Sequence, residues 1–234
     1  MKRLVSQFTK QLLEALEIGK SAKLKTNKKE ISSMVITGLG GSGIGGKIAT
    51  QIIAEQLKIP VIINNDYNLP EFVNENTLVI VSSFSGNTEE TLEALKKAQL
   101  AEAEIACITS GGKIAEIAKT KNYNLIILPK AFSPRAMLTY SIVQQLFLFN
   151  HYGLINDSFI NEIASTISLL DKEIDNIKDL AHQTSLLLHT KTFVLYSESS
   201  IEGALIRLRQ QINENSKCLG WHHVVPEMNH NELV

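Results

Sequence analysis

The alternation of short apolar runs with helical patterns constrains the fold of this chain more than any other feature. Five runs are continuously apolar instead of alternating with polar residues, as is typical of parallel strands covered on both faces. The predicted strands are residues 34–37, 60–63, 78–82, 105–109 and 125–128. The predicted helices that follow them are residues 44–57, 88–98, 113–120 and 136–151. This alternation predicts an α/β fold with a doubly wound, five-stranded parallel sheet.

A glycine-rich stretch follows the first predicted strand and reads GLGGSGIGGK over residues 38–47. Such a density of glycines indicates a backbone that turns sharply or approaches another group closely. A strand, a glycine turn and a helix N-terminus form an anion site, because free N–H groups and the positive end of the helix dipole point the same way. The stretch therefore predicts a phosphate site, and the alternative is a tight strand-to-helix turn that holds no ligand.

Two better-known phosphate motifs overlap in this stretch, and neither is complete. Residues 38–43 fit the dinucleotide pattern G-x-G-x-x-G, which also requires an acidic residue at the end of the next strand. That strand ends in two asparagines, with Asp66 as a late candidate. Residues 41–47 fit G-x-x-x-x-G-K, but Ile48 stands where a Ser or Thr would bind magnesium.

A second loop, residues 82–90 (SSFSGNTEE), places the hydroxyls of Ser83, Ser85 and Thr88 between a predicted strand and a predicted helix. Helix capping by Thr88 would explain one hydroxyl. Ser83 and Ser85 stand at the strand end, where doubly wound sheets bind their ligands. Hydroxyl and backbone N–H donors suit a phosphate monoester, and one hydrogen bond to a charged group contributes roughly 1.5–3 kcal/mol.

A third loop, residues 129–135 (PKAFSPR), leads into the long apolar helix predicted for residues 136–151. Arg135 is expected at the N-terminus of that helix, where the dipole disfavours a cation. An arginine aimed at an anionic substrate or intermediate would explain the position. The alternative is an ordinary exposed arginine.

The pattern changes at both ends of this predicted sheet. Residues 1–18 have helical spacing, and Gly19 is expected to end that leading helix. Beyond Gly153 we predict a helix at 158–189, a strand at 192–197, a helix at 201–213 and a strand at 218–225. The predicted domains are 1–153, with the leading helix and the first sheet, 154–190, a helical connector, and 191–234, an incomplete second α/β domain.

Glu214 follows the predicted helix 201–213 at its C-terminal end, which is an unfavourable place for a carboxylate. An ordinary exposed glutamate is the alternative interpretation. The last block, residues 221–232, holds His222, His223 and His230. We expect no metal site there, because the block has neither a thiolate nor H-x-x-x-H spacing.

Length and charge narrow the remaining choices. A chain of 234 residues has room for one large α/β domain or for one domain and part of another. A net charge of −1 favours neither nucleic acid nor an anionic membrane as a partner. Cys107 and Cys218 lie far apart in the sequence, which fits a reducing compartment. No 18-residue apolar run and no signal-peptide pattern is present, so we expect a cytoplasmic protein.

Five segments together, GLGGSGIGG, SSFSGNTEET, SPRAML, NENSK and PEMNHNE, resemble the bifunctional phosphoglucose/phosphomannose isomerases of the sugar isomerase (SIS) superfamily. They follow the family's order, and the match runs from about Met34 to the last residue. The resemblance implies two SIS subdomains, each with a flavodoxin-like sheet, in a homodimer that needs no cofactor. It also implies that the sugar phosphate is held by Gly41, Ser42, Ser83, Ser85 and Thr88.

The resemblance implies three further roles. Glu214, in NENSK, corresponds to the base that moves a proton between C1 and C2 of the sugar, and a carboxylate can do this if its pKa is tuned. Arg135 corresponds to the group that stabilises the cis-enediol, since arginine keeps its charge. His230, in PEMNHNE, corresponds to the ring-opening residue contributed by the partner subunit, and histidine exchanges protons near neutral pH.

Members of the family continue beyond PEMNHNE, where a C-terminal helix carries a lysine that assists ring opening and a threonine is tied to use of mannose phosphate. We therefore expect this sequence to lack the C-terminal part. The leading hypothesis is an aldose–ketose isomerase that interconverts glucose 6-phosphate, and mannose 6-phosphate, with fructose 6-phosphate. The second is a non-catalytic SIS module that binds sugar phosphates. The pair Glu214 and His230 favours the enzyme, and the missing tail favours the module.

Overall fold

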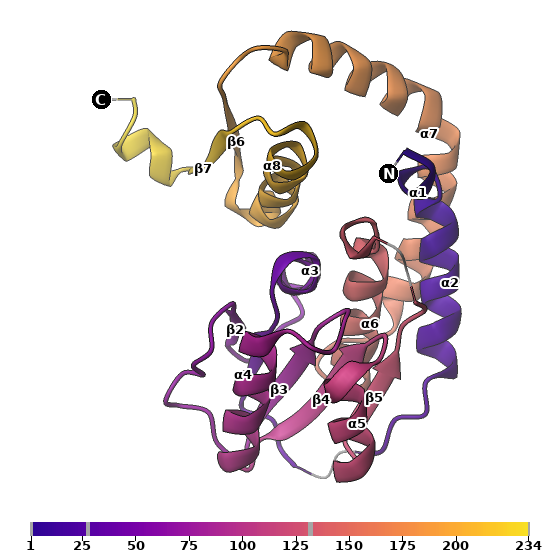
Figure 1. Cartoon of the computed structure of the whole chain (residues 1–234), viewed down its shortest axis with the longest axis vertical. Helices are drawn as coiled ribbons and strands as arrows, with labels where there is room; N and C mark the ends of the chain where they lie inside the picture. Colours follow the sequence, from indigo (N-terminus) through magenta and orange to yellow (C-terminus); the bar gives the residue numbers. More distant parts are fainter. Residues whose placement is uncertain (1, 27–28, 131–132, 234) are drawn as a thin grey trace. The chain divides into compact units, whose positions relative to one another are not determined.

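The structure is a computed structural model that describes residues 2–26, 29–130 and 133–233 (Figure 1). The chain forms two compact units, Met1–Ala164 and Ser165–Val234. We refer to them as the first and the second unit. The domain boundaries expected near residues 153 and 190 remain predictions.

The first unit contains a parallel sheet of five strands, which confirms the predicted fold class. The strands are β1 (Ser33–Thr37), β2 (Val61–Asn64), β3 (Thr77–Ser82), β4 (Glu104–Thr109) and β5 (Asn124–Ile127). Their spatial order is β2-β1-β3-β4-β5, and every neighbouring pair is parallel. This is the flavodoxin-like order, which reverses direction between β1 and β3 and binds ligands outside the carboxyl ends of those two strands.

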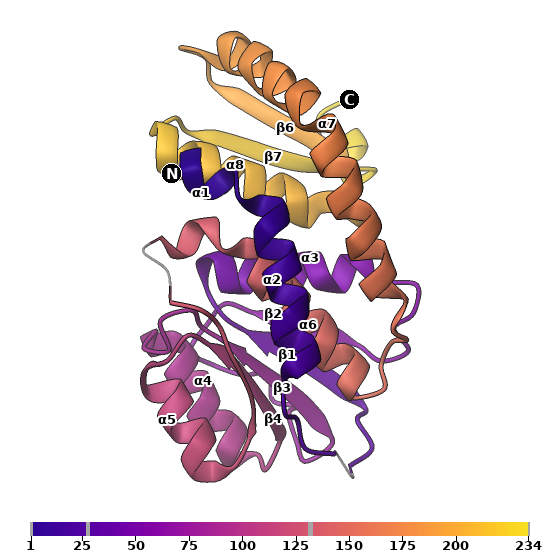
Figure 2. The same ribbon diagram turned by 90° about the vertical axis from the view of Figure 1, so that its right-hand side faces the viewer.

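Helices cover both faces of this sheet (Figure 2). Helices α4 (Glu89–Leu100) and α5 (Gly112–Lys121) pack against one face. Helices α2 (Phe8–Ser21), α3 (Gly40–Ile52) and α6 (Leu138–His151) form the layer on the other. Every residue of β1 and β3 is buried, because neither face of these central strands meets water. Double coverage is therefore the physical reason for the continuous apolar runs in the sequence.

The leading helix differs from its prediction. It is divided into α1 (Lys2–Val5) and α2, and α2 continues through Gly19 to Ser21 instead of ending at the glycine. A side chain at Gly19 would overlap the ring of Phe147 on α6. The prediction of Gly19 as a C-cap was wrong, since the glycine serves the close packing of two helices.

Helix α3 also differs from its prediction, because it begins at Gly40, four residues earlier than expected, and ends at Ile52. Glycines of the expected turn thus lie inside the helix. A Cβ at Gly45 would lie 2.7 Å from Cβ of Ser141, and one at Gly46 would lie 2.8 Å from Cγ2 of Ile36. These glycines bring α3 close to α6 and to β1.

The second unit contains the predicted two strands and the helix between them. Helix α7 (Ser158–Leu188) enters this unit from the first. Strands β6 (Phe193–Glu198) and β7 (Gly220–Val225) form a parallel pair, joined through the 3₁₀ turn η2 (Ser199–Ile201) and helix α8 (Glu202–Ser216). Helix α8 packs on both strands. The chain then forms a last 3₁₀ turn, η3 (Glu227–His230).

Candidate functional site

Two predicted loops meet where the strand order reverses. Strands β1 and β3 are paired in register, with Thr37 opposite Val81 at their carboxyl ends. A Cβ at Gly38 would lie 2.5 Å from the carbonyl oxygen of Ser82. The glycine turn after β1 therefore lies directly against the end of β3, which leads into the loop of Ser83, Ser85 and Thr88.

The glycine turn presents the N-terminus of α3. Leu39 occupies the N-cap position, and no side chain caps the helix through a hydrogen bond. The N–H groups of Ser42 and Gly43 turn back to the carbonyl of Leu39, at 3.1 and 3.3 Å. Gly41 and Ser42 are both partly exposed. The first turn of a helix that lacks a side-chain cap is suited to an anion.

The hydroxyl loop is arranged around a pair of side chains. The hydroxyls of Ser83 and Thr88 are 2.8 Å apart, and either can donate to the other. Thr88 occupies the N-cap position of α4, but its side chain makes no capping bond. Helix capping therefore does not account for its hydroxyl. Because one hydrogen suffices to join two hydroxyls, the pair retains a second hydrogen that can be donated to a ligand.

The rest of the loop is held by short-range bonds. The Oγ of Ser83 accepts from the N–H of Gly86 at 3.2 Å, and the Oγ of the exposed Ser85 accepts from the N–H of Asn87 at 3.2 Å. Gly86 has φ of +69°, and a Cβ there would overlap the carbonyl of Gly111. With its oxygen already accepting, Ser85 can offer its hydrogen to an anion, and so can whichever of Ser83 and Thr88 does not donate to the other.

The turn that carries Arg135 lies against the glycine turn. Arg135 belongs to η1 (Pro134–Ala136), a 3₁₀ turn, and α6 begins only at Leu138. The prediction that Arg135 starts the helix was therefore wrong by one short turn. A Cβ at Gly41 would lie 3.8 Å from the carbonyl oxygen of Pro134. Residues 131–132 of the predicted loop lie outside the described part of the chain.

The two predicted proton-transfer residues lie in the second unit. Glu214 is exposed in the last turn of α8, as its sequence position predicts, and Lys217 follows that helix in the left-handed conformation. His230 is exposed in η3, after β7. The structure thus places the phosphate-loop candidates and Arg135 in the first unit, and both proton-transfer candidates in the second.

Two polar contacts to Glu232 hold the segment that bears His230. The hydroxyl of Tyr196 on β6 donates to Oε2 of Glu232 at 2.5 Å, and Nδ1 of His223 on β7 contacts Oε1 of the same carboxylate. This hydrogen bond to Glu232 is the main reason that the pKa of Tyr196 is raised above its usual value. Sequence reasoning missed Tyr196 and Glu232, because only the parallel register sets Tyr196 opposite His223.

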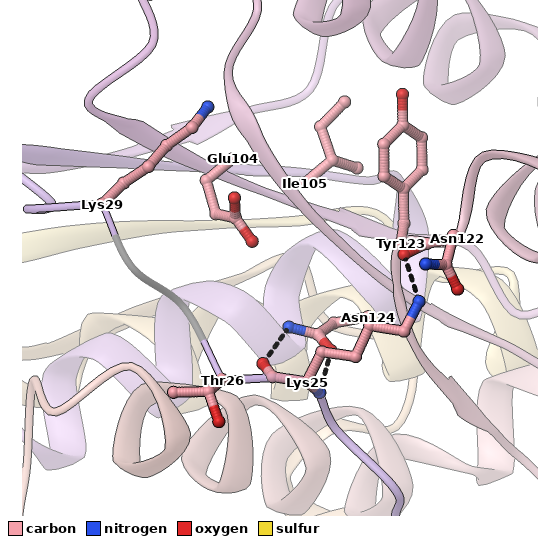
Figure 3. Close-up of a pocket in the computed structure, with 8 residues that line it drawn as sticks. All are labelled: Lys25, Thr26, Lys29, Glu104, Ile105, Asn122, Tyr123 and Asn124. Carbon is pink, nitrogen blue, oxygen red and sulfur yellow. Dashed lines mark hydrogen bonds between the residues drawn. The ribbon is translucent and has the colours of Figure 1, made fainter.

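A pocket of about 310 Å³ lies at the other end of the sheet, at the start of β4 and β5 (Figure 3). The N–H of Lys25 donates to Oδ1 of Asn124 at 2.7 Å, and Nζ of Lys25 donates to the carbonyl of Asn122 at 2.7 Å. These bonds tie the segment after α2 to the sheet. The pocket is therefore structural in character and lies away from the edge where such sheets bind ligands.

Metal ligands and membrane-spanning helices also bear on the class of site. Within residues 2–26, 29–130 and 133–233, no cluster of three or more His, Cys, Asp or Glu side chains could hold a metal ion. None of the helices in the described residues combines the length and apolar character needed to cross a membrane.

Comparisons with known proteins match two family descriptions to separate parts of the chain. The SIS domain family matches residues 29–154, and the family described as bacterial phospho-glucose isomerase C-terminal SIS domain matches residues 177–234. A bifunctional phosphoglucose/phosphomannose isomerase of Caldicellulosiruptor bescii is 41% identical over 237 residues, which cover 98% of this chain and 70% of the relative. The enzyme of the same name from Thermoplasma volcanium is 32% identical over 231 residues, covering 97% and 71%.

A solved structure supports the fold alone. The C-terminal domain of glucosamine-fructose-6-phosphate aminotransferase from Francisella tularensis superimposes with a TM-score of 0.73 at 17% identity. The match covers 98% of this chain and 72% of that one.

Proposed function

Because the chain belongs to the bifunctional phosphoglucose/phosphomannose isomerase family of SIS-domain proteins, we propose that it interconverts glucose 6-phosphate and mannose 6-phosphate with fructose 6-phosphate. The observation that carries this proposal is the meeting of the glycine turn and the hydroxyl loop at the carboxyl ends of β1 and β3. That is the edge at which a sheet of this order binds its ligand.

The first unit binds the phosphate in this proposal. The helix N-terminus at Gly41 and Ser42 supplies the N–H of Gly41, the hydroxyl of Ser42 and a positive dipole end. Ser83, Ser85 and Thr88 supply hydroxyl hydrogens from the neighbouring loop. A phosphate monoester needs such donors, and each bond to its charge contributes roughly 1.5–3 kcal/mol.

The reaction itself is a proton transfer between neighbouring carbons. Glu214 removes the proton from C2 of the open-chain aldose, and the C2–H electron pair forms the C1–C2 double bond of the enediol. The carbonyl electrons move to the C1 oxygen, which takes up the proton that the C2 hydroxyl gives up. The same carboxylic acid then returns its proton to C1 as the ketose forms. Arg135 opposes the charge that develops on the oxygens.

The cyclic sugar must open before this transfer. His230 donates to the ring oxygen and accepts the proton of the anomeric hydroxyl, because imidazole exchanges protons near neutral pH. In a homodimer, His230 would act on the substrate of the partner subunit. Two cysteines without a disulfide, Cys107 and Cys218, support a cytoplasmic location.

The experiment compares glucose 6-phosphate and mannose 6-phosphate isomerisation by the parent protein with that by His230→Ala. The variant should lose most activity on cyclic sugars and keep more on an open-chain analogue, since only the former needs ring opening. Equal losses on both substrates would remove His230 from the ring-opening role. Sedimentation at micromolar concentration that showed a fully active monomer would contradict the exchange between subunits.

A non-catalytic sugar-phosphate module is the alternative function. Such a module would bind the sugar phosphate through the same loops of the first unit. A parent protein that binds fructose 6-phosphate but shows no turnover would establish the module and exclude the isomerase.

A further inference from the structure

Helix α6 carries four buried polar side chains in two pairs that face different helices. Thr139 and Gln144 face α2: Oγ1 of Thr139 donates to Oε1 of Gln11 at 3.1 Å, and Nε2 of Gln144 donates to the carbonyl of Ala15 at 2.7 Å. The other pair, Ser141 and Gln145, faces α3. Each of the four is at most 5% exposed. Buried polar groups of this kind are costly unless they are paired.

The pair facing α3 forms a chain of hydrogen bonds that ends at the carbonyl of Ser42, in the first turn of α3. Nε2 of Gln145 donates to Oγ of Ser141 at 3.3 Å, and Oγ of Ser141 donates to the carbonyl of Ser42 at 3.4 Å. The spacing of four residues puts both side chains on one face of α6. The chain therefore runs from the interior of the first unit to the first turn of α3.

The glycines of α3 make room for this chain. A Cβ at Gly45 would overlap Oγ of Ser141, and a Cβ at Gly46 would lie 3.2 Å from Oε1 of Gln145. Glycine inside a helix costs about 0.5–1 kcal/mol relative to alanine, so two glycines at the contact require a reason. Close approach of the two polar side chains to the helix backbone is such a reason.

Resting on the proposed phosphate site, we propose that Ser141 and Gln145 are positioning residues for sugar-phosphate binding. Ser141 holds the carbonyl of Ser42, and Gln145 holds Ser141. Together they fix the first turn of α3, and with it the directions of the N–H of Gly41 and the hydroxyl of Ser42. A turn that is held in its binding orientation before the ligand arrives loses less entropy on binding. Ser141 touches no substrate and acts through Ser42.

The test compares Ser141→Ala with Thr139→Ala, which removes a buried hydroxyl from the same helix on the side of α2. Isothermal titration with inorganic phosphate and KM measurements with fructose 6-phosphate are made on both. Ser141→Ala should raise the phosphate Kd and the KM by about 3- to 10-fold, the net effect of one hydrogen bond. Its kcat should stay within about twofold. Thr139→Ala should lower the melting temperature and leave the Kd within about twofold.

A second pair of variants serves if Ser141→Ala fails to fold. Gln145→Met and Gln144→Met keep the length of the side chain and remove the amide, and only Gln145→Met should raise the phosphate Kd. Equal Kd values within either pair would overturn the inference while leaving the proposed function intact. A parent protein that binds neither inorganic phosphate nor fructose 6-phosphate would instead overturn the proposed function, and the inference with it.

Discussion

The two units of this chain differ in how fully their sheets are covered. In the first unit, helices lie on both faces, and β1 and β3 are buried along their whole length. In the second, burial alternates along β6 and β7. Val194, Tyr196 and Trp221 are each between 44% and 51% exposed. These exposed side chains show that one face of the second sheet is open in the described residues, whereas parallel sheets are ordinarily covered on both faces.

This difference in coverage assigns the two parts of the proposed function to different units. The phosphate loops stand on a complete core, which can hold donors in fixed directions. The proposed proton-transfer residues, Glu214 and His230, stand on exposed positions of the smaller unit. Changes in the first unit should therefore act on binding and stability, and changes in the second on turnover.

The largest effect is expected from Glu214→Gln, which keeps the shape of the side chain and removes its basicity. Loss of a general base typically lowers the rate by roughly 10²–10⁴-fold, so kcat should fall within that range. Binding of fructose 6-phosphate should stay within several-fold, because the loops of the first unit are untouched. The control is Glu198→Gln, another carboxylate of the second unit. A Glu214→Gln enzyme that kept more than about a tenth of kcat would contradict the assignment of Glu214 as the base.

The next largest effect is on stability in the first unit. Gly86→Ala combines a φ of +69° with overlap of the Gly111 carbonyl, and we expect a loss of about 3 kcal/mol in the free energy of unfolding. Gly153→Ala is the matched control. It has φ of +71° and nothing within 4 Å of the added Cβ, so it should lose only about 1 kcal/mol. Urea unfolding measures both, and similar losses would show that the contact with Gly111 is unimportant.

A smaller effect is expected from Ser85→Ala in the hydroxyl loop. Because the phosphate is bound throughout the reaction, the variant should raise KM by about tenfold and leave kcat nearly unchanged. Ser21→Ala removes an exposed hydroxyl that donates within α2 and should change neither constant. A fall in kcat with an unaltered KM would move Ser85 from binding to chemistry.

The smallest effect concerns His222 in the second unit. Burial, and then the charge of Arg209, lower the pKa of His222 below its usual value of 6.5. As the pH falls, the unfolded chain therefore takes up this proton before the folded chain does. The free energy of unfolding that depends on neutral His222 is fully present above pH 6.5, and it is lost as the pH falls through the lower pKa of the folded state. NMR titration of the imidazole, assigned with His222→Gln, measures this pKa. A value at or above 6.5 would contradict the burial.

The sequence predicted the strands and the site loops better than it predicted the uses of glycine and of buried polar residues. Continuous apolar runs report double coverage directly, and the loops follow from where those runs end. Gly19, by contrast, meets Phe147, which lies far away in the sequence, so a close helix contact could not be told from a helix end. Ser141 and Gln145 are two polar residues four apart in an apolar helix, and this spacing was the one sign in the sequence that they share a face. Only the fold shows which partner they meet.

We propose above all that the sugar phosphate binds to the loops at the carboxyl ends of β1 and β3. The most direct measurement is a crystal structure of the protein soaked with fructose 6-phosphate. We expect the phosphate between the Gly41–Ser42 turn and the hydroxyls of Ser83, Ser85 and Thr88. Phosphate density found only elsewhere, for example beside Lys25 at the start of β5, would contradict the account.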